Sequence, residues 1–318
     1  MRFLVCGVGS IGLRHLKNLI ALGYSDIILY RTGKSTINDG SEALNEFKVF
    51  NNLELALDAN PEVCIISNPS SLHVDTAIKC AMAGCHLFIE KPLSDNLKGL
   101  DELNKIVQER KLITLITYQF RFHPHIRLLK NILESRDTSY GYPIYASAEW
   151  SEYLPDWHPW EDYKKSYSAR KDLGGGVFLT QVHPINYLSF LFGPIKEFTH
   201  RKYCSGSLGI EVNDSADSLI EFNSGIIGHV HVDYIQKPRV HKLKVVMTEG
   251  RFEWDCHANS LHYISKNASI DNFPNNNFER NDMFITMLKE FIECVEKNIE
   301  TNFTLKEASE ELNHLLTG

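Results

Sequence analysis

Three glycines near the start of the chain have a spacing that suits a dinucleotide. They form a Gly-x-Gly-x-x-Gly turn that follows an apolar run over 2–6 and opens a segment with helical spacing over 11–22. In such a turn the glycines permit a tight bend, a close approach of pyrophosphate and close helix–strand packing, and the helix N-terminus favours phosphate. A ligand-free tight turn is the plain alternative. The predicted contacts are with Gly7, Gly9, Ser10, Ile11 and Gly12.

The residue that ends the second predicted strand, over 27–30, bears on which dinucleotide is bound. A carboxylate at this place holds the ribose 2′-hydroxyl of NAD. Here Arg31 stands there, followed by Thr32 and Lys34. A guanidinium suits a 2′-phosphate, which a carboxylate would repel. NADP is therefore the predicted cofactor, although a solvated arginine would leave NAD possible.

Strands and helices alternate over the first part of the chain. Further apolar runs typical of strands cover 63–67, 86–89 and 112–117, with helical spacing over 72–83 and 97–110 between them. This alternation predicts right-handed crossovers and a parallel sheet. The expected fold class is α/β, with an N-terminal doubly wound Rossmann domain over 1–118.

The pattern changes after Tyr118. A helix is expected over 125–135, and a long polar and aromatic stretch over 151–173 suggests a functional loop. A second helix is expected over 180–192. Strand-like runs without intervening helices predict a mainly antiparallel sheet; they cover 144–150, 196–204, 216–222, 226–234, 240–247 and 251–255.

Two helices are expected at the end of the chain, over 281–297 and 305–316, and Thr304 with Glu307 forms a capping box for the last one. The second domain is therefore expected to be an α+β domain over 119–318. Its last helix is expected to pack back on the first domain.

Composition limits the classes of function. The chain has 318 residues, 43% hydrophobic residues and a net charge of −7, which argues against a nucleic-acid binder. It has no apolar run near the roughly 18 residues of a membrane span and no signal-peptide core. Its seven scattered cysteines suggest reduced thiols. We expect a cytoplasmic protein with no membrane partner. No metal is predicted, since His229, His231 and Asp233 alternate as on the open face of a sheet.

Three motifs together resemble the Gfo/Idh/MocA family of oxidoreductases. They are the glycine turn, the segment Pro-Glu-Val-Cys-Ile-Ile-Ser-Asn-Pro over 61–69, and Glu-Lys-Pro over 90–92. The resemblance implies a Rossmann domain followed by a large open sheet, through which members form homodimers or homotetramers. It also implies hydride transfer between nicotinamide and a hydroxyl or keto carbon, commonly of a sugar or cyclitol. Segments 118–124 and 153–163 are similar to members associated with surface-sugar biosynthesis.

The resemblance gives Lys91 a catalytic role beside the nicotinamide. An ammonium can stabilise a developing alkoxide or polarise a carbonyl. Glu90 is expected to orient Lys91, and Pro92 to fix a tight turn through a cis peptide bond. A surface Glu–Lys pair of under about 1 kcal/mol is the alternative.

The family also has a glycine run, an aspartate and then a histidine on one helix. The histidine corresponds to His183, whose imidazole suits general acid–base catalysis; a hydrogen-bonded histidine inside a helix pair is the alternative. Thr180 stands where the family has the aspartate, and Asn186 lies one turn beyond His183. Thr180 cannot stabilise a charged imidazole. A cofactor-binding or regulatory protein with impaired catalysis therefore stays open as a second hypothesis.

Further ligand contacts are expected from both domains. On the cofactor side they are Ser67, Asn68, Pro69, His73, Glu90, Lys91 and Gln119. On the side of a sugar-type substrate, which a nucleotide or acidic group would make anionic, they are Lys91, Arg121, His123, Trp157, Trp160, Tyr163, Arg170, Thr180, His183 and Asn186. Several of these contacts have an equal alternative. Arg121 could form a structural ion pair, the aromatic residues could pack in the core, and Arg170 could lie at a solvated corner.

Overall fold

The computed structural model describes residues 1–33, 44, 46–135, 138–275 and 277–318. The chain divides into two compact units. The first consists of Met1–Thr117 and Asn281–Leu312, and the second of Tyr118–Arg280 and Asn313–Gly318. The predicted cofactor residue Lys34 lies outside the described residues.

The first unit contains a six-stranded sheet in which every pairing is parallel. The strand order is β3-β2-β1-β4-β5-β6. Successive strands are therefore added on one side of β1 up to β3 and on its other side from β4 onward, which places the topological switch point between β1 and β4. This is the doubly wound order that was predicted, and ligands bind such sheets at the carboxyl ends of the strands near the switch point. The strands are β1 (Phe3–Cys6), β2 (Ile27–Tyr30), β3 (Lys48–Phe50), β4 (Val63–Ile66), β5 (His86–Ile89) and β6 (Thr114–Ile116).

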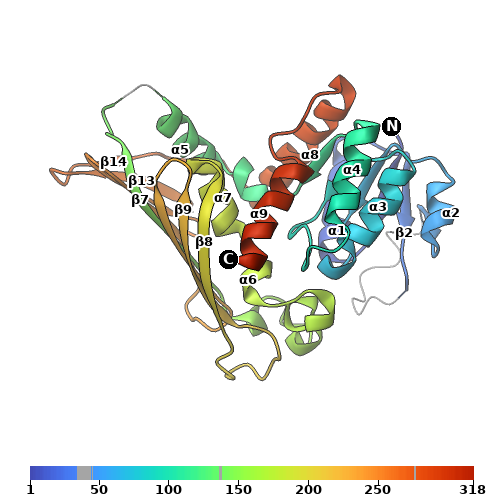
Figure 1. Cartoon of the computed structure of the whole chain (residues 1–318), viewed down its shortest axis with the longest axis horizontal. Coiled ribbons are helices and arrows are strands. Elements are labelled where there is room, and N and C mark those ends of the chain that lie inside the picture. Colours follow the sequence, from blue (N-terminus) through green and yellow to red (C-terminus); the bar gives the residue numbers. More distant parts are fainter. Residues whose placement is uncertain (34–43, 45, 136–137, 276) are drawn as a thin grey trace. The chain divides into compact units, whose positions relative to one another are not determined.

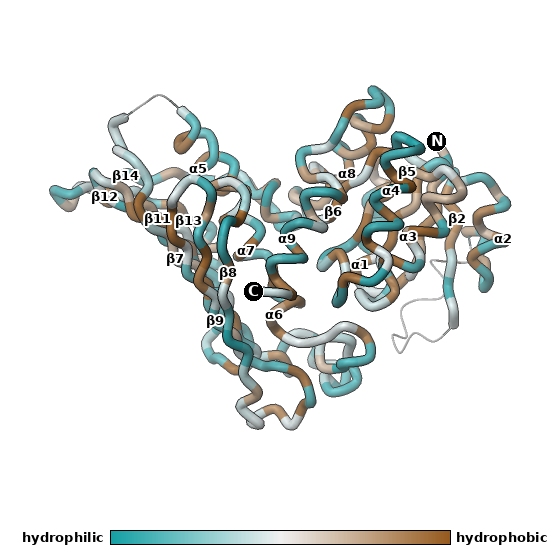
Figure 2. Tube along the Cα trace, viewed as in Figure 1, coloured by the Kyte–Doolittle hydropathy of each residue, from teal (hydrophilic) through white to brown (hydrophobic). Residues whose placement is uncertain are grey.

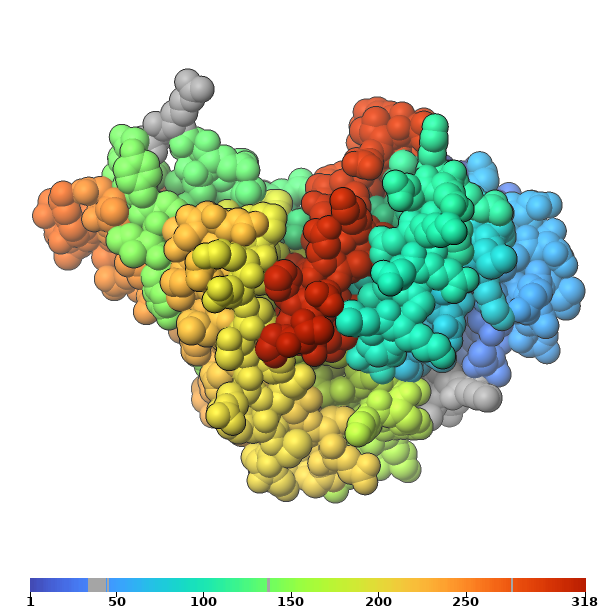
Figure 3. Space-filling model, in the orientation of Figure 1, coloured from blue at the N-terminus to red at the C-terminus, as the bar shows by residue number. Residues whose placement is uncertain are grey.

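Helices cover both faces of this sheet (Figure 1). On one face lie α1 (Ser10–Ala21) and α8 (Arg280–Lys297), which contact each other through Asn18 and Asn281. On the other lie α3 (His73–Met82) and α4 (Leu100–Arg110). The central strands are buried on both faces, which explains their continuous apolar runs. The outward residues of α4 are exposed and hydrophilic (Figure 2), and this helix lies at the surface in the space-filling view (Figure 3).

Some elements of this unit were not predicted. β3 and the short helix α2 (Leu53–Leu57) are brief, and Lys48 and Val49 on β3 are exposed, so neither element has a clear apolar pattern.

The segment after α8 returns to the sheet edge. There Thr301 Oγ1 donates to the carbonyl of Thr114 at 2.6 Å, and α9 (Leu305–Thr317) begins with Leu305 N donating to Thr114 Oγ1 at 2.9 Å.

The second unit is built on an eight-stranded sheet of order β14-β13-β12-β11-β7-β10-β9-β8. It is mainly antiparallel, as predicted, with one parallel pair between β7 and β10. β13 and β14 were not predicted. The strands are β7 (Pro143–Ser151), β8 (Ile195–Tyr203), β9 (Ser215–Phe222), β10 (Ile227–Asp233), β11 (Val240–Met247), β12 (Gly250–Asp255), β13 (Ser260–Ser265) and β14 (Ile270–Asn272).

The two faces of this sheet differ. One face packs against α7 (His183–Phe192), where a side chain on Gly228 would meet Leu188. The other carries a row of alternating charge across six neighbouring strands. In register, the row is Arg201, Asp217, His231, Glu149, Lys242 and Asp255. Polar side chains at every second position are what a solvated sheet face requires.

His231 lies between two carboxylates of this face. Its Nδ1 is 2.9 Å from Asp217 and its Nε2 is 3.1 Å from Asp233. The hydrogen bond to Asp233, partly opposed by burial and supported by Asp217, raises the pKa of His231 to about 9.

Within the described ranges, no group of three or more His, Cys, Asp or Glu residues is arranged to hold a metal ion. The described helices include none long and apolar enough to cross a bilayer.

The structure corrects the helix expected over 180–192. Two helices occupy the region: α6 (Val177–Thr180) and α7, separated by Gln181 and Val182. Pro184 lies in the first turn of α7, where its missing N–H costs no hydrogen bond. His183 therefore begins a helix instead of lying inside one. Further α-helix and 3-10 turns of this unit are α5 (Pro124–Glu134), η3 (Gln119–Phe122), η4 (Leu154–Asp156), η5 (Tyr163–Lys165), η6 (Tyr167–Ala169) and η7 (Lys171–Leu173).

Candidate active site

The glycine turn lies at the carboxyl end of β1 and is closed by its own backbone. Gly7 has φ +91°, and a Cβ there would be 2.7 Å from the backbone nitrogen of Asn68. A Cβ on Gly12 would be 2.0 Å from the carbonyl oxygen of Gly7. Both positions therefore require glycine. The N-cap residue of α1, Gly9, has no side chain to cap the helix, and the first turn has no acidic residue. These features fit the pyrophosphate of a nicotinamide dinucleotide.

The loop after β4 packs directly on this turn. Ser67 Oγ donates to the carbonyl of Gly7 at 2.7 Å. Asn68 Nδ2 donates to Thr76 Oγ1 at 2.8 Å, which ties the loop to α3. Ser67, Asn68 and Pro69 therefore lie at the same sheet edge as the glycines. This is the edge at which a dinucleotide binds in doubly wound sheets.

The turn Glu90-Lys91-Pro92 follows β5 at this edge. The Lys91–Pro92 peptide bond is cis, as predicted. One carboxylate oxygen of Glu90 lies 2.7 Å from His15 Nε2, and the other accepts the backbone N–H of Lys91 at 3.2 Å. Burial raises the pKa of Glu90, but His15, Lys91 and Thr117 together outweigh it, so the pKa is lowered.

His73 joins the Glu-Lys-Pro turn to the neighbouring loop. Its Nδ1 is 2.9 Å from the carbonyl oxygen of Pro92, and its Nε2 is 2.8 Å from that of Asn68. Only an imidazolium donates to both carbonyls. Burial opposes that charge and lowers the pKa of His73, although both hydrogen bonds act the other way. The neutral ring therefore donates to one carbonyl at a time at neutral pH.

Arg31 lies at the carboxyl end of β2, with its backbone N–H bonded to Phe50 O at 2.9 Å. The guanidinium is partly exposed, and Thr32 is exposed. The chain thus places a cation at the strand end where a carboxylate would serve NAD.

His183, in the second unit, lies in a box of aromatic rings. Its imidazole is 1% exposed. The edges of Tyr118 and Phe120 approach it, with ring centroids at 5.8 and 5.1 Å. Trp150 of β7 stacks on it with centroids 5.4 Å apart and planes inclined by 26°. The box fixes the plane of the ring, which a proton-transferring histidine requires.

Comparison with known proteins identifies the family. Residues 1–118 match an oxidoreductase family with an NAD-binding Rossmann fold, GFO_IDH_MocA. Residues 126–253 match the GFO/IDH/MocA C-terminal domain. The chain belongs to the Gfo/Idh/MocA family of oxidoreductases.

Several Gfo/Idh/MocA relatives are similar over much of the chain. A myo-inositol 2-dehydrogenase of Thermotoga maritima is 26% identical over 240 residues, covering 72% of this chain and 67% of that protein. A scyllo-inositol 2-dehydrogenase (NAD(+)) of Bacillus subtilis is 26% identical over 313 residues, covering 93% and 86%. A structure of UDP-N-acetylglucosamine 3-dehydrogenase from Acidithiobacillus ferrooxidans shares the fold, with a TM-score of 0.80 at 19% identity and coverage of 99% and 95%.

The other predicted polar residues of this Gfo/Idh/MocA chain are buried around α7. Arg121 Nε donates to Asn186 Oδ1 at 2.8 Å, and its guanidinium lies 5.1 Å from the ring centre of Phe190. Thr180 is buried at the end of α6, and Gln119 is buried in η3. Arg121 and Asn186 therefore hold η3 against α7, which is a structural role that the sequence left open for Arg121.

His123 caps a helix. Its Nδ1 accepts the backbone N–H of His125 at 3.2 Å at the start of α5. Its ring packs between Trp254 and Phe278 and has no exposed surface. Burial, followed by the charge of His125, lowers the pKa of His123 to about 3. The ring is therefore neutral and structurally engaged at physiological pH.

The predicted loop residues have different surroundings. Trp157 packs edge-on against Tyr234 at 5.3 Å, and Tyr163 donates its hydroxyl to Leu208 O at 2.9 Å. Trp160 is 76% exposed. Arg170 Nε donates to Asp172 at 3.0 Å, so a carboxylate already accompanies this cation. Within the loop, Trp160 has the ring surface most open to a sugar.

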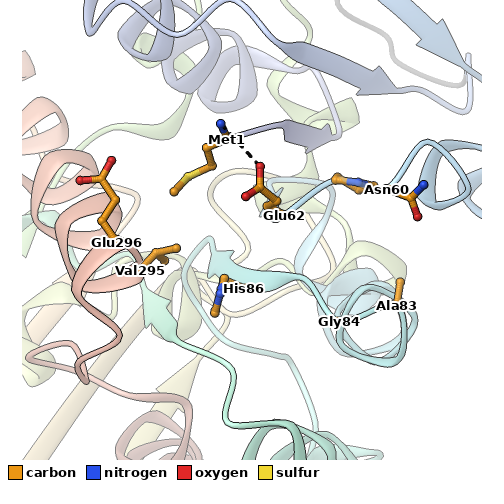
Figure 4. Close-up of a pocket in the computed structure, with 9 residues that line it drawn as sticks. Met1, Asn60, Glu62, Ala83, Gly84, His86, Val295 and Glu296 are labelled. Carbon is orange, nitrogen blue, oxygen red and sulfur yellow. Dashed lines mark ion pairs between the residues drawn. The ribbon is translucent and has the colours of Figure 1, made fainter.

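The first unit also has a cavity of about 630 Å³, but it lies at the opposite edge of the sheet. It is lined by residues at the amino ends of β1, β4 and β5, among them Met1, Glu62 and His86, and by the end of α8 (Figure 4). The amino group of Met1 and the carboxylate of Glu62 are 3.5 Å apart there. This cavity is therefore separate from the glycine turn.

Proposed function

We propose that this protein is an oxidoreductase that interconverts a hydroxyl and a keto carbon of a sugar or cyclitol, with NADP as the preferred cofactor. One observation carries the proposal. The Glu-Lys-Pro turn and the glycine turn share one sheet edge, where His15 and His73 fix the backbone around Lys91. The names of the two inositol dehydrogenases among the relatives support the substrate class. The motifs over 118–124 and 153–163 favour a role in surface-sugar biosynthesis, with a nucleotide-linked or acidic sugar.

The cofactor and Lys91 have separate tasks. When bound, a nicotinamide dinucleotide accepts a hydride from an alcohol carbon or donates one to a carbonyl carbon. Lys91 binds the reacting oxygen through its ammonium group and stabilises the negative charge that develops on it. Glu90 orients Lys91 by accepting its backbone N–H.

His183 moves the proton. In oxidation it takes the proton of the substrate hydroxyl, and in reduction it returns a proton to the alkoxide. Thr180 replaces the carboxylate that the family places before the histidine, so the aromatic box orients the ring here. Trp160, Arg170, Thr180 and Asn186 remain our candidates for substrate contacts.

The cofactor preference follows from charge. Arg31 offers a fork of donors that suits a 2′-phosphate, whereas an NAD-binding site offers a carboxylate.

The partner of the substrate domain is proposed to be another copy of the chain, in a homodimer or homotetramer formed through the charged face of the eight-stranded sheet. Light scattering coupled to gel filtration measures that mass directly.

Turnover tests the proposal. Purified protein is mixed with NADP⁺ or NAD⁺ and a panel of sugars, cyclitols and nucleotide sugars, and reduced cofactor is followed at 340 nm. We expect at least one polyol to be oxidised with NADP⁺. The second hypothesis, a cofactor-binding protein without catalysis, is favoured by Thr180. It predicts nucleotide binding with no turnover in either direction.

A further inference from the structure

A buried hydrogen bond connects the helix of the glycine turn with the Glu-Lys-Pro turn. His15 lies on α1, three residues after Gly12, and its Nε2 is 2.7 Å from a carboxylate oxygen of Glu90. We propose that His15 is a positioning residue that keeps Glu90 ionised, so that its negative charge stays beside Lys91 and its carboxylate holds the Lys91 backbone N–H. The inference rests on the proposed function, since it gives a role to the lysine assigned to catalysis there.

Burial makes Glu90 dependent on its partners. Its side chain is 8% exposed and that of His15 is 0% exposed. A buried carboxylate without partners takes up a proton, because the neutral form is the cheaper one in an apolar surrounding. Burial is indeed the largest influence on Glu90, and it raises the pKa. The hydrogen bond from His15 is the largest influence in the opposite direction.

The groups that face Glu90 come from four elements. His15 lies on α1, Lys91 is the next residue of the turn, Thr117 follows β6, and His73 lies on α3. Thr117 has no charge, and the pKa of His73 is lowered by burial. His15 and Lys91 are therefore the groups that decide the ionisation of Glu90.

The ring of His15 is itself held in place. Phe88 of β5 meets it edge-on, with centroids 5.1 Å apart and planes at 84°. Phe284 of α8 packs on it at 6.2 Å. Its neighbour Asn18 is bonded to Asn281 of α8 at 2.9 Å. The position of Nε2 is thus fixed by packing from β5 and α8, so His15 gives the Glu90 carboxylate one orientation.

Removal of His15 should favour the protonated form of Glu90. Glu90 loses the strongest of the influences that keep it ionised and takes up a proton. A protonated carboxyl no longer provides the negative charge beside Lys91, so the attraction that favours the ammonium group over the nucleophilic amine is lost. The glycine turn itself keeps its residues, so nucleotide affinity should change little.

The experiment compares His15→Leu with His15→Gln, which retains an N–H donor. His86→Gln is the matched control, since His86 is a half-buried histidine at the opposite sheet edge, bonded to the N–H of Ile113 at 2.9 Å. The first readout is the labelling rate of Lys91 in apoprotein at pH 8, with an amine-reactive reagent and peptide mass spectrometry. Nucleotide Kd by calorimetry and kcat and KM with the substrate identified are measured on the same samples.

We expect Lys91 to be labelled roughly threefold or more faster in His15→Leu, because the labelling rate follows the uncharged fraction of the amine. His15→Gln should lie near the wild type, and His86→Gln should equal it. In His15→Leu kcat should fall by about tenfold or more, with KM and nucleotide Kd within roughly threefold.

Unchanged Lys91 labelling in folded His15→Leu overturns the inference, as does an equal change in His86→Gln. If His15→Leu does not fold, Glu90→Gln must reproduce the faster labelling, and failure to do so has the same meaning. The labelling needs neither substrate nor cofactor. If Lys91 is labelled as expected but the wild type shows no turnover, the proposed function alone is excluded. If the wild type turns over substrate but Lys91 labelling is unchanged in the variant, the inference alone is excluded.

Discussion

The imidazole of His183 lies against the indole of Trp150, with ring centroids 5.4 Å apart and planes inclined by 26°. A further ring that contacts this indole is His241, stacked with centroids 4.5 Å apart and planes inclined by 2°. Burial, followed by the imidazoles of His257 and His123, lowers the pKa of His241 well below its usual value. Trp150 therefore lies between a neutral imidazole that supports it and the imidazole assigned to proton transfer.

Shortening Trp150 should reduce catalysis. Trp150→Leu removes the flat surface that orients His183, and we expect kcat to fall by about tenfold, with a smaller loss for Trp150→Phe. Trp254→Phe is the control, since Trp254 packs on His241 and Phe120. The measurement is kcat and KM of folded variants. Equal losses in Trp254→Phe and Trp150→Leu would show that general packing, not orientation of His183, is responsible.

The cofactor preference should follow the charge at position 31. Arg31→Asp places a carboxylate where NADP carries its 2′-phosphate, so NADP⁺ affinity should fall by about tenfold or more while NAD⁺ affinity is kept or rises. Calorimetric titration with both nucleotides measures the change. Parallel loss of both affinities would contradict the assignment of Arg31 to the 2′-phosphate.

Gly12→Ala should abolish nucleotide binding, because its Cβ would be 2.0 Å from Gly7 O and 2.8 Å from Ser67 Oγ. Gly23→Ala is the control. Gly23 has φ +89° with open space around it, so the substitution lowers stability by about 1 kcal/mol through backbone strain. Nucleotide titration and thermal unfolding separate the two effects. Retained affinity in Gly12→Ala would mean that the turn does not hold the pyrophosphate.

The His231 pair should make stability depend on pH above neutrality. Its pKa is about 9 in the folded protein, raised from 6.5. A histidine whose pKa is higher in the folded protein than in the unfolded chain stabilises the fold. This stabilisation is fully present below pH 6.5 and is lost as the pH rises through 9. The contribution is of the order of 1 kcal/mol after solvent screening. Urea unfolding at pH 6 and pH 9.5 should show a loss that is smaller in His231→Gln. An identical loss in both proteins would exclude His231 as its source.

The sequence predicts the parts of the fold that depend on local pattern. Alternating strands and helices and an apolar run at each central strand are sufficient for the parallel sheet, and the Thr304–Glu307 capping box is confirmed by its hydrogen bonds. β3 was overlooked because a strand of three residues, two of them exposed, carries little pattern. The helix break before His183 depends on Pro184, which is compatible with a helix start as well as with a kink.

The candidate site is less visible in the sequence where distant residues meet. His15 bonds to Glu90 across 75 positions, and a single histidine on an amphipathic helix gives no sign of such a partner. Its place directly after the glycine turn was the one available signal. His123 shows the reverse: it is near a motif, but in the structure its ring caps α5.

Lys91→Ala tests the central claim most directly, with Lys98→Ala as an exposed control on the same unit. Turnover with the identified substrate and nucleotide Kd are measured together for both variants. The account predicts that Lys91→Ala loses turnover by at least about a thousandfold while nucleotide Kd stays within roughly threefold, and that Lys98→Ala behaves as the wild type. Turnover by Lys91→Ala at the wild-type rate would contradict the account.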